Sequence, residues 1–201
     1  MPKLPFSFYQ DKGVNQLAVQ LLGKRLCTFV DGVLTSGIIV ETEAYNGIED
    51  KASHAYGGRF TDRTKIMYEH GGIAYVYLCY GIHHLFNVVT APQGTPHAVL
   101  IRGVEPVTGL EVMLKRRNMS VLKPNLTAGP GALAKAMGID KKLNGKDLCG
   151  DEIWIEGDGV LFDDKQVVAS SRVGVDYAGD HALLPWRYYI KGNKFVSKPN
   201  S

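Results

Sequence analysis

The stretch VLTSGIIVETEAY, residues 33–45, has the composition of a long strand that ends in acidic and aromatic residues. Successive side chains of a strand point to opposite faces, so Glu41, Glu43 and Tyr45 share one face and smaller residues fill the other. The simplest interpretation is an amphipathic strand whose acidic face meets water. A second interpretation makes that face the floor of a pocket, where a carboxylate beside an aromatic ring can act as a general base. Spacing alone leaves both interpretations open.

The segments before this strand predict a hairpin and a helix. LCTFV, residues 26–30, has strand composition, and the Asp31-Gly32 pair is a strong signal for a tight turn into the next strand. Apolar residues recur at helical spacing from Val14 to Leu22, and the following glycine is a plausible stop. The first third of the chain is therefore expected to be one helix followed by a hairpin.

The segments after residue 70 predict more strands than helices. Residues 71–90 contain two β-rich runs around a tight Tyr80-Gly81 turn, and residues 97–106 read as a strand that stops at Pro106. Two helices are expected, one over residues 108–118 with Thr108 as its cap and one over residues 129–139. The part from Asp151 onward reads as strands, with turns at 157–159 and 192–193. Because strands and helices do not alternate, an α+β fold with a mostly antiparallel sheet is predicted.

Composition places the chain among ordinary globular proteins. Its 201 residues are enough for one domain, 45% of them are hydrophobic, and the net charge is only +3. Three widely spaced cysteines without a CxxC pair argue against a disulfide framework or a zinc site. The sequence has no signal-peptide pattern and no apolar run long enough for a membrane span. We expect an intracellular protein, in the cytoplasm or nucleoid of a prokaryote, with no membrane partner.

The turn at Tyr80 is expected to project an apolar tip. Tyr75 and Tyr77 share a strand face and suit a packed aromatic ladder, but Tyr80 and Ile82 flank a turn, where packing explains them less easily. A protruding apolar wedge is what a protein needs to part stacked bases of a duplex. Basic residues that could hold phosphates, each by default a solvated surface charge, are Arg59, Arg63, Lys65, Lys115, Arg116, Arg117 and Arg187.

Five ordered segments carry a family resemblance. VETEAYNGIEDKASHAYGGRFTDR, AYVYLCYGIHHLFNVVT, HAVLIRGVEP, LTAGPGALAKAMGI and RVGVDYAGDHALLPWRYYIKGN together resemble the alkyladenine (3-methylpurine) DNA glycosylases. The similarity covers nearly the whole chain. It implies a single domain over residues 1–201, with a curved, mostly antiparallel sheet, surrounding helices and a protruding hairpin. Residues 1–10 and about 192–201 are expected to be loosely ordered ends.

The resemblance also assigns roles to individual residues. Glu43 matches the water-activating general base, and Arg102 matches the arginine that places the water and a nearby phosphate. Tyr80 matches the residue that intercalates in place of the extruded nucleotide, with Ile82 beside it. The residues that match the base pocket are Tyr45, His54, Tyr77 and Asn87, the last as a clash with the exocyclic amine of guanine. Arg117 matches a candidate phosphate contact. Independently of the resemblance, the expected helix start at Gly131 is a second candidate, because backbone N–H groups there can hold a phosphate.

The implied activity is the release of a damaged purine from double-stranded DNA, with no metal and no other cofactor. No lysine matches a Schiff-base nucleophile, so a monofunctional enzyme that leaves an intact abasic site is expected, acting as a monomer. Three other functions stay open: a non-catalytic nucleic-acid-binding module, a hydrolase or transferase of another nucleoside or of RNA, and a metal enzyme. The metal enzyme would draw on Glu49, Asp50, His54, His70, His83 and His84, which lack HxH or HExxH spacing.

Overall fold

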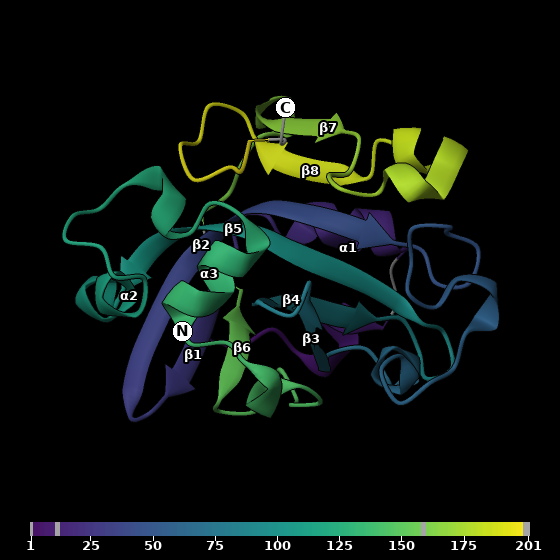
Figure 1. Cartoon of the computed structure of the whole chain (residues 1–201), viewed down its shortest axis with the longest axis horizontal. Helices are drawn as coiled ribbons and strands as arrows, with labels where there is room; N and C mark the ends of the chain where they lie inside the picture. The colour runs from purple at the N-terminus through teal and green to yellow at the C-terminus, as the bar shows by residue number, and fades with distance from the viewer. Residues whose placement is uncertain (1, 11–12, 158–159, 199–201) are drawn as a thin grey trace.

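The long strand β2 (Val33–Tyr45) lies at the centre of an eight-stranded sheet. A computed structural model of the chain describes residues 2–10, 13–157 and 160–198 (Figure 1). The strand order is β3-β4-β5-β2-β1-β6, with β8 pairing to both β2 and β7, and the paired strands run antiparallel. The other strands are β1 (Arg25–Val30), β3 (Ala74–Cys79), β4 (His83–Thr90), β5 (His97–Thr108), β6 (Ile153–Glu156), β7 (Val167–Ser170) and β8 (Arg187–Ile190). The predicted α+β class with a mostly antiparallel sheet is confirmed.

β2 is central because three strands pair with it. β5 runs along one side, while the other side is shared by β1 over the first half and by β8 at Glu41, Thr42 and Glu43. The register with β5 shifts on both sides of Glu41, which lies opposite Gly103. Such bulges bend a strand and re-aim its side chains, and here they occur where the acidic residues begin.

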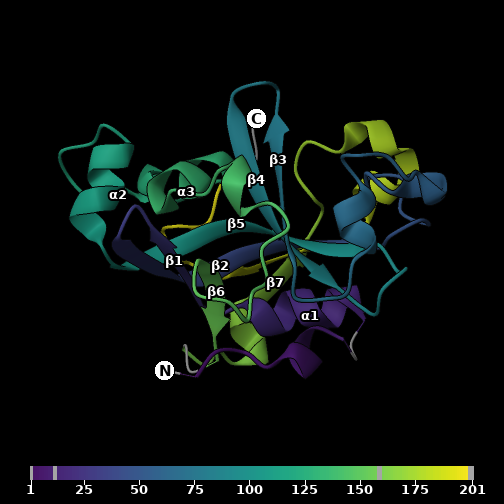
Figure 2. The same ribbon diagram turned by 90° about the horizontal axis from the view of Figure 1, so that it is seen from below.

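Helices cover both faces of the sheet (Figure 2). α1 (Val14–Leu21) packs on one face, and α3 (Pro130–Met137) packs on the other beside α2 (Leu110–Arg116). α3 starts with proline at its first turn and ends at Gly138, whose φ of 71° suits a glycine, as predicted. Short 3-10 helices lie at Phe6–Tyr9, Tyr56–Gly58, Lys65–Tyr68, Pro124–Leu126, Lys141–Leu143, Asp164–Gln166 and Asp176–Leu183.

Two predictions about β5 and α2 are wrong. The strand does not stop at Pro106 but continues to Thr108, with Pro106 opposite Gly37 of β2. β4 pairs with β5 only at residues 97–100, so in the described sheet the proline lies where β5 has a strand neighbour on one side alone, and a missing N–H is tolerated there. The residue before α2 is Gly109, not Thr108, which still belongs to β5. Gly109 has a φ of 76°, and a side chain there would come within 2.6 Å of the carbonyl of Leu34, so the position suits a glycine.

The expected loose ends are packed where they are described. Tyr9 is fully buried and Phe195 is 2% exposed, and both belong to the main hydrophobic core. Residues 1 and 199–201 lie outside the described part of the chain, as do residues 158 and 159 of the expected turn at 157–159. Between β7 and β8 the chain forms the 3-10 helix Asp176–Leu183 rather than a strand. No helix in the described ranges has the length and apolar character to span a bilayer.

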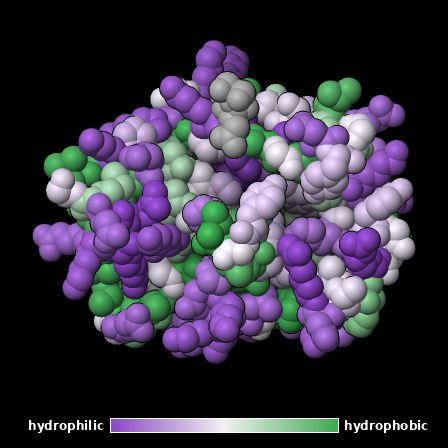
Figure 3. Space-filling view, viewed as in Figure 1, coloured by the Kyte–Doolittle hydropathy of each residue, from purple (hydrophilic) through white to green (hydrophobic). Residues whose placement is uncertain are grey.

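The β3–β4 hairpin projects from the sheet, as Figure 2 shows. At its tip Tyr80 and Gly81 have φ values of 50° and 74°, the two positive values of a tight hairpin turn, and the Ile82 N–H donates to the Cys79 carbonyl at 3.1 Å. A tyrosine rarely adopts such a φ. Its side chain is 89% exposed, and that of Ile82 is 71% exposed. In the space-filling view, which looks at the molecule from the same side as Figure 1, hydrophobic side chains gather near the centre of the visible face and hydrophilic ones border them (Figure 3).

Candidate active site

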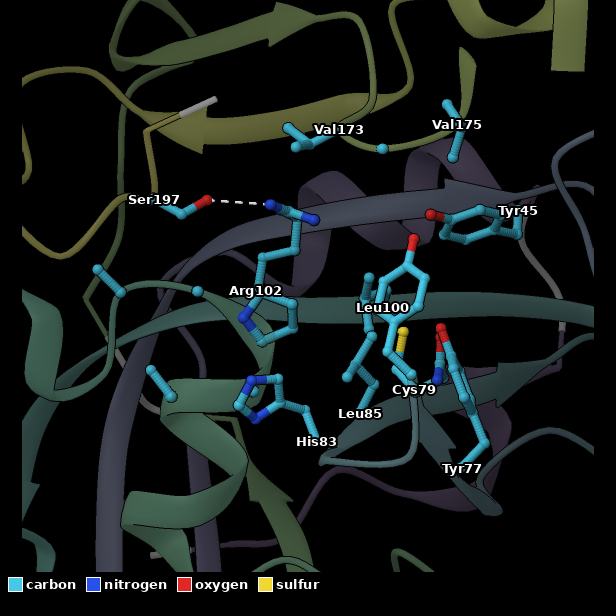
Figure 4. Close-up of a pocket in the computed structure, with 18 of the residues that line it drawn as sticks. Tyr45, Tyr77, Cys79, His83, Leu85, Leu100, Arg102, Val173, Val175 and Ser197 are labelled. Atoms are coloured by element: carbon cyan, nitrogen blue, oxygen red, sulfur yellow. Dashed lines mark hydrogen bonds between the residues drawn. The ribbon is translucent and has the colours of Figure 1, made fainter. Parts of the chain in front are cut away.

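A cavity of about 1170 Å³ lies between the β3–β4 hairpin, the start of α3 and the segment before the last 3-10 helix. Residues from all three regions converge on it, together with β2 and β5 (Figure 4). The predicted site residues that line it are Tyr45, His54, Tyr77, Tyr80, Ile82, Asn87, Arg102, Arg117 and Gly131. The structure therefore brings together residues that lie up to 86 positions apart, from Tyr45 to Gly131.

Glu43 lies directly behind this lining and is fully buried. Its Oε1 accepts the backbone N–H of Val173 at 2.8 Å, and its Oε2 accepts the hydroxyl of Tyr45 at 2.9 Å. Nη1 of Arg102 lies 3.3 Å from Oε1. The interpretation in which the acidic face of β2 meets water is wrong, because Glu41 is fully buried as well. Two hydrogen bonds and an ion pair with Arg102 therefore hold the Glu43 carboxylate in one orientation behind the cavity wall.

Tyr45 forms one wall beside this carboxylate. Burial raises the pKa of its hydroxyl well above 10, and the neighbouring Glu43 raises it further. The hydroxyl therefore keeps its proton and donates to Glu43. The guanidinium of Arg172 lies 4.8 Å from the ring centroid of Tyr45 and 5.1 Å from that of Trp186, so a cation–π contact fixes the ring.

His54 and two tyrosines of β3 form another wall. The rings of Tyr75 and Tyr77 are 5.3 Å apart, and His54 meets Tyr77 edge-on at 4.7 Å. Nδ1 of His54 is 2.9 Å from the Tyr75 hydroxyl, and Nε2 is 3.3 Å from Nη2 of Arg63. Burial lowers the pKa of His54 to about 4, helped by Arg63 and Arg59. The imidazole is therefore neutral, and because a guanidinium only donates, Nε2 is the acceptor and Nδ1 carries the hydrogen.

Glu41, the first acid of the pair, has a different environment from Glu43. Its Oε1 accepts Nε of Arg102 at 2.8 Å and Nε of Arg187 at 2.7 Å, and Ser197 supplies two further hydrogen bonds. Burial opposes the charge of Arg102, but the carboxylates of Glu43 and Glu41 outweigh it and raise the pKa of the guanidinium. These contacts give Glu41 a structural and electrostatic role.

Asp50 belongs to a second buried ion pair, which the sequence analysis missed. Arg172 donates to both carboxylate oxygens of Asp50 and to the carbonyls of Ala44 and His181, each at 3.0 Å. This pair ties the loop that leads to His54 onto the segment that holds Glu43. It also occupies the carboxylate that a metal site would have used, and within the described ranges no cluster of three or more His, Cys, Asp or Glu residues could hold a metal ion.

The remaining predicted residues, Asn87, Arg117 and Gly131, also line the cavity. Asn87 is 3% exposed and its Nδ2 donates to the carbonyl of Tyr75 at 3.2 Å, which fixes the amide. Nη2 of Arg117 donates to the carbonyl of Asn125 at 3.1 Å. Gly131 lies in the first turn of α3, where a side chain would come within 2.9 Å of the His83 ring. The start of α3 thus packs closely against His83, and residues 129–132 line the cavity.

Comparison with known proteins identifies the family of the chain. The family described as methylpurine-DNA glycosylase (MPG) matches residues 7–194. A protein of Bacillus cereus (strain G9842), provisionally named a 3-methyladenine DNA glycosylase, is 48% identical over 96% of this chain and 98% of its own length. A protein of Alkaliphilus oremlandii (strain OhILAs) with the same provisional name is 46% identical over 98% of this chain and 99% of its own. With a match over nearly its full length, the chain is a member of the methylpurine-DNA glycosylase family.

Proposed function

We propose that the cavity receives an alkylated or deaminated purine everted from duplex DNA, and that Glu43 activates the water that releases it. Membership of the family makes the chain a hydrolase of N-glycosyl bonds in DNA base excision repair. The observation that carries the finer proposal is the fully buried Glu43, held by Tyr45, Arg102 and Val173 at the edge of a cavity whose other wall is aromatic.

The proposal begins with eversion of the target nucleotide. A base within a duplex cannot reach a buried carboxylate, and extruding it costs a few kcal/mol, less for a damaged or mispaired base. Tyr80 and Ile82 project from the hairpin beside the cavity mouth, where their exposed side chains would fill the space left in the stack. The hairpin that carries the wedge also contributes one wall of the cavity, so the hole would be filled as the base enters.

Aromatic walls would then select the damaged base. A purine methylated at N3 or N7 is cationic, and electron-rich rings such as those of Tyr45 and Tyr77 favour a cation by about 0.5 to 2 kcal/mol. The neutral imidazole of His54 adds no charge to oppose it. The amide of Asn87, fixed by its hydrogen bond to Tyr75, would clash with the exocyclic amine of guanine. Neutral lesions such as hypoxanthine would depend on the shape of the cavity instead.

Hydrolysis would proceed through an oxocarbenium-like sugar. Water attacks C1′ as the bond to the purine nitrogen breaks, and that nitrogen keeps the bonding electrons, so a cationic purine leaves as a neutral molecule. Glu43 takes a proton from the water and its charge stabilises the sugar cation. Two-carboxylate glycosidases offer a partial analogy, but here a cationic leaving group replaces the acid. Arg102, which borders both Glu43 and the cavity, would place the water and a phosphate.

We propose a monofunctional enzyme, because a carboxylate rather than an amine occupies the place beside Tyr45. Lys194 and Lys198 line the same cavity, so a Schiff base is open to direct test. Borohydride reduction during turnover would trap a covalent protein–DNA adduct if either lysine attacked C1′. We expect no adduct and no strand cleavage before alkali. We also expect one chain to act on one lesion as a monomer, which sedimentation of the complex would test.

The decisive experiment measures base release from defined lesions. The protein is incubated in a metal chelator with duplexes that carry one N3-methyladenine, N7-methylguanine, hypoxanthine or ethenoadenine. Free base is measured by chromatography and abasic sites by alkaline cleavage. We expect release from at least one alkylated duplex. Tight binding to the lesion duplexes without release of any base would instead identify a non-catalytic module.

A further inference from the structure

The guanidinium of Arg102 uses its three nitrogens on three different partners. Nε donates to Oε1 of Glu41 at 2.8 Å, and Nη2 donates to Oγ of Ser197 at 3.1 Å. Only Nη1 is directed to Glu43, at 3.3 Å. Arg102 is 6% exposed, so protein groups surround the guanidinium. Two of its nitrogens are held by Glu41 and Ser197, and the third faces Glu43.

Ser197 is engaged through every polar atom it has. Its N–H donates to Oε2 of Glu41 at 2.6 Å and its hydroxyl donates to Oε1 at 2.7 Å. The hydroxyl hydrogen is thereby committed to Glu41, so the oxygen presents a lone pair to Arg102. The Ser197 carbonyl accepts Nη2 of Arg187 at 2.7 Å. The residue is 9% exposed and lies where the chain after β8 returns to the sheet.

The charges around this serine balance. Arg187 donates to Glu41 at 2.7 Å, so the buried group contains two carboxylates, Glu41 and Glu43, and two guanidinium groups, Arg102 and Arg187. Glu41 receives four hydrogen bonds and is fully occupied. Arg187 therefore neutralises Glu41, which leaves the charge of Arg102 available to Glu43.

Gly103 makes this approach of the chain possible. A side chain at Gly103 would come within 2.6 Å of the Phe195 carbonyl and 3.4 Å of Oε2 of Glu41. Because residue 103 has no side chain, the backbone of residues 195–197 can cross β5 directly beside it. The space at Gly103 and the hydrogen bonds of Ser197 together bring Ser197 against Arg102.

We infer that Ser197, with Glu41, is a positioning residue that aims Nη1 of Arg102 at Glu43 and the attacking water. This inference rests on the proposed function, because it assigns Ser197 a role through Arg102 in that reaction. In this role Ser197 acts through Arg102 and not directly on the water or the base. Without its hydroxyl, Nη2 loses an acceptor and the guanidinium can rotate about its bond to Glu41, so the reaction slows while DNA binding persists.

The test compares Ser197→Ala with Ser197→Thr. We expect the alanine variant to release base about tenfold more slowly at saturating enzyme, since small misplacements of a catalytic group have effects of this size, with DNA affinity unchanged. Ser197→Thr keeps a hydroxyl and should restore most of the rate. Ser171→Ala is the matched control, because Ser171 is exposed and lines a neighbouring second cavity. It should release base at the wild-type rate.

A double-mutant cycle separates positioning from general stability. In an Arg102→Ala background, Ser197→Ala should cause no further loss of rate, because the group it positions is gone. An equal loss in both backgrounds, or a wild-type rate for Ser197→Ala, would overturn the inference. If Ser197→Ala does not fold, Ser197→Cys, with a weakly hydrogen-bonding thiol, replaces it in the same cycle. Absence of base release by the wild-type protein would instead count against the proposed function.

Discussion

The hydroxyl of Tyr45 donates to Oε2 of Glu43 at 2.9 Å, across one face of β2. A residue proposed to stack on the base and the residue proposed to activate water are thus joined by a direct hydrogen bond. Burial and the nearby carboxylate raise the pKa of Tyr45 well above 10, so this bond persists throughout the neutral range. The ring and the carboxylate are therefore expected to keep a constant relation while DNA binds.

Replacing Glu43 by glutamine should separate binding from chemistry. The amide is close in size to the carboxylate but cannot take a proton from water, so base release should fall by at least about a hundredfold. Affinity for a lesion duplex should stay within a few fold of wild type. Single-turnover release and fluorescence anisotropy measure the two quantities. A variant with the wild-type release rate would show that another group is the base.

Replacing Tyr80 should weaken DNA binding without harming the fold. Its φ of 50° is unfavourable for tyrosine, so Tyr80→Gly should fold at least as well as wild type. Loss of the exposed ring should weaken binding to an abasic-site duplex by about 1 to 3 kcal/mol. Tyr80→Phe, which keeps the ring and loses the hydroxyl, is the control and should bind like wild type. Equal affinities of the glycine and phenylalanine variants would exclude intercalation by Tyr80.

Removing one partner of the Asp50–Arg172 pair should destabilise the protein. Both side chains are fully buried, and breaking such a pair leaves an unpaired charge at a cost of about 3 to 5 kcal/mol. Arg172→Met should therefore lower the free energy of unfolding in urea by roughly that amount. The exposed Asp62–Lys65 pair supplies the control, because Asp62→Asn should change the free energy of unfolding by less than about 1 kcal/mol. Similar effects of both variants would contradict the assignment.

His54 should make stability depend on pH between 6.5 and 4. Its pKa is about 4 in the folded protein and near 6.5 when unfolded, so the unfolded chain binds this proton first. The stabilising contribution is complete above pH 6.5 and is lost as the pH falls toward 4, amounting to about 3 kcal/mol at most. Urea unfolding of wild type and His54→Gln across this range should give a shallower pH dependence for the variant. Parallel curves would mean that His54 is readily protonated in the fold.

Part of this site could be predicted because its cues are local. Alternation along residues 33–45 placed Glu41, Glu43 and Tyr45 on one face, and the tight turn at Tyr80 predicted an exposed tip. Alternation could not reveal burial, since a polar face looks the same whether it meets water or a cavity. Only the strands, cavity walls and arginines that surround β2 make the difference.

The unpredicted residues depend on contacts between distant segments. Arg172 meets Asp50 across 122 positions, and Ser197 meets Glu41 across 156. Arg172 opens one of the five segments that carry the resemblance and Ser197 lies outside all of them, but neither falls in a periodic pattern that would point to its partner. The errors at Pro106 and Thr108 have the same origin. Each depends on which strand or carbonyl lies beside the residue, and local propensity does not contain that information.

The hydrogen bonds between Glu41 and Ser197 also have a consequence for biosynthesis. Arg102 leaves the ribosome well before residue 197, so during translation its guanidinium and Glu41 lack one of their final partners. Contacts across such long separations form late and slow the approach to the native state. A nascent chain should therefore acquire its strands before its catalytic competence, and premature termination should yield a product that does not attack the genome's glycosidic bonds.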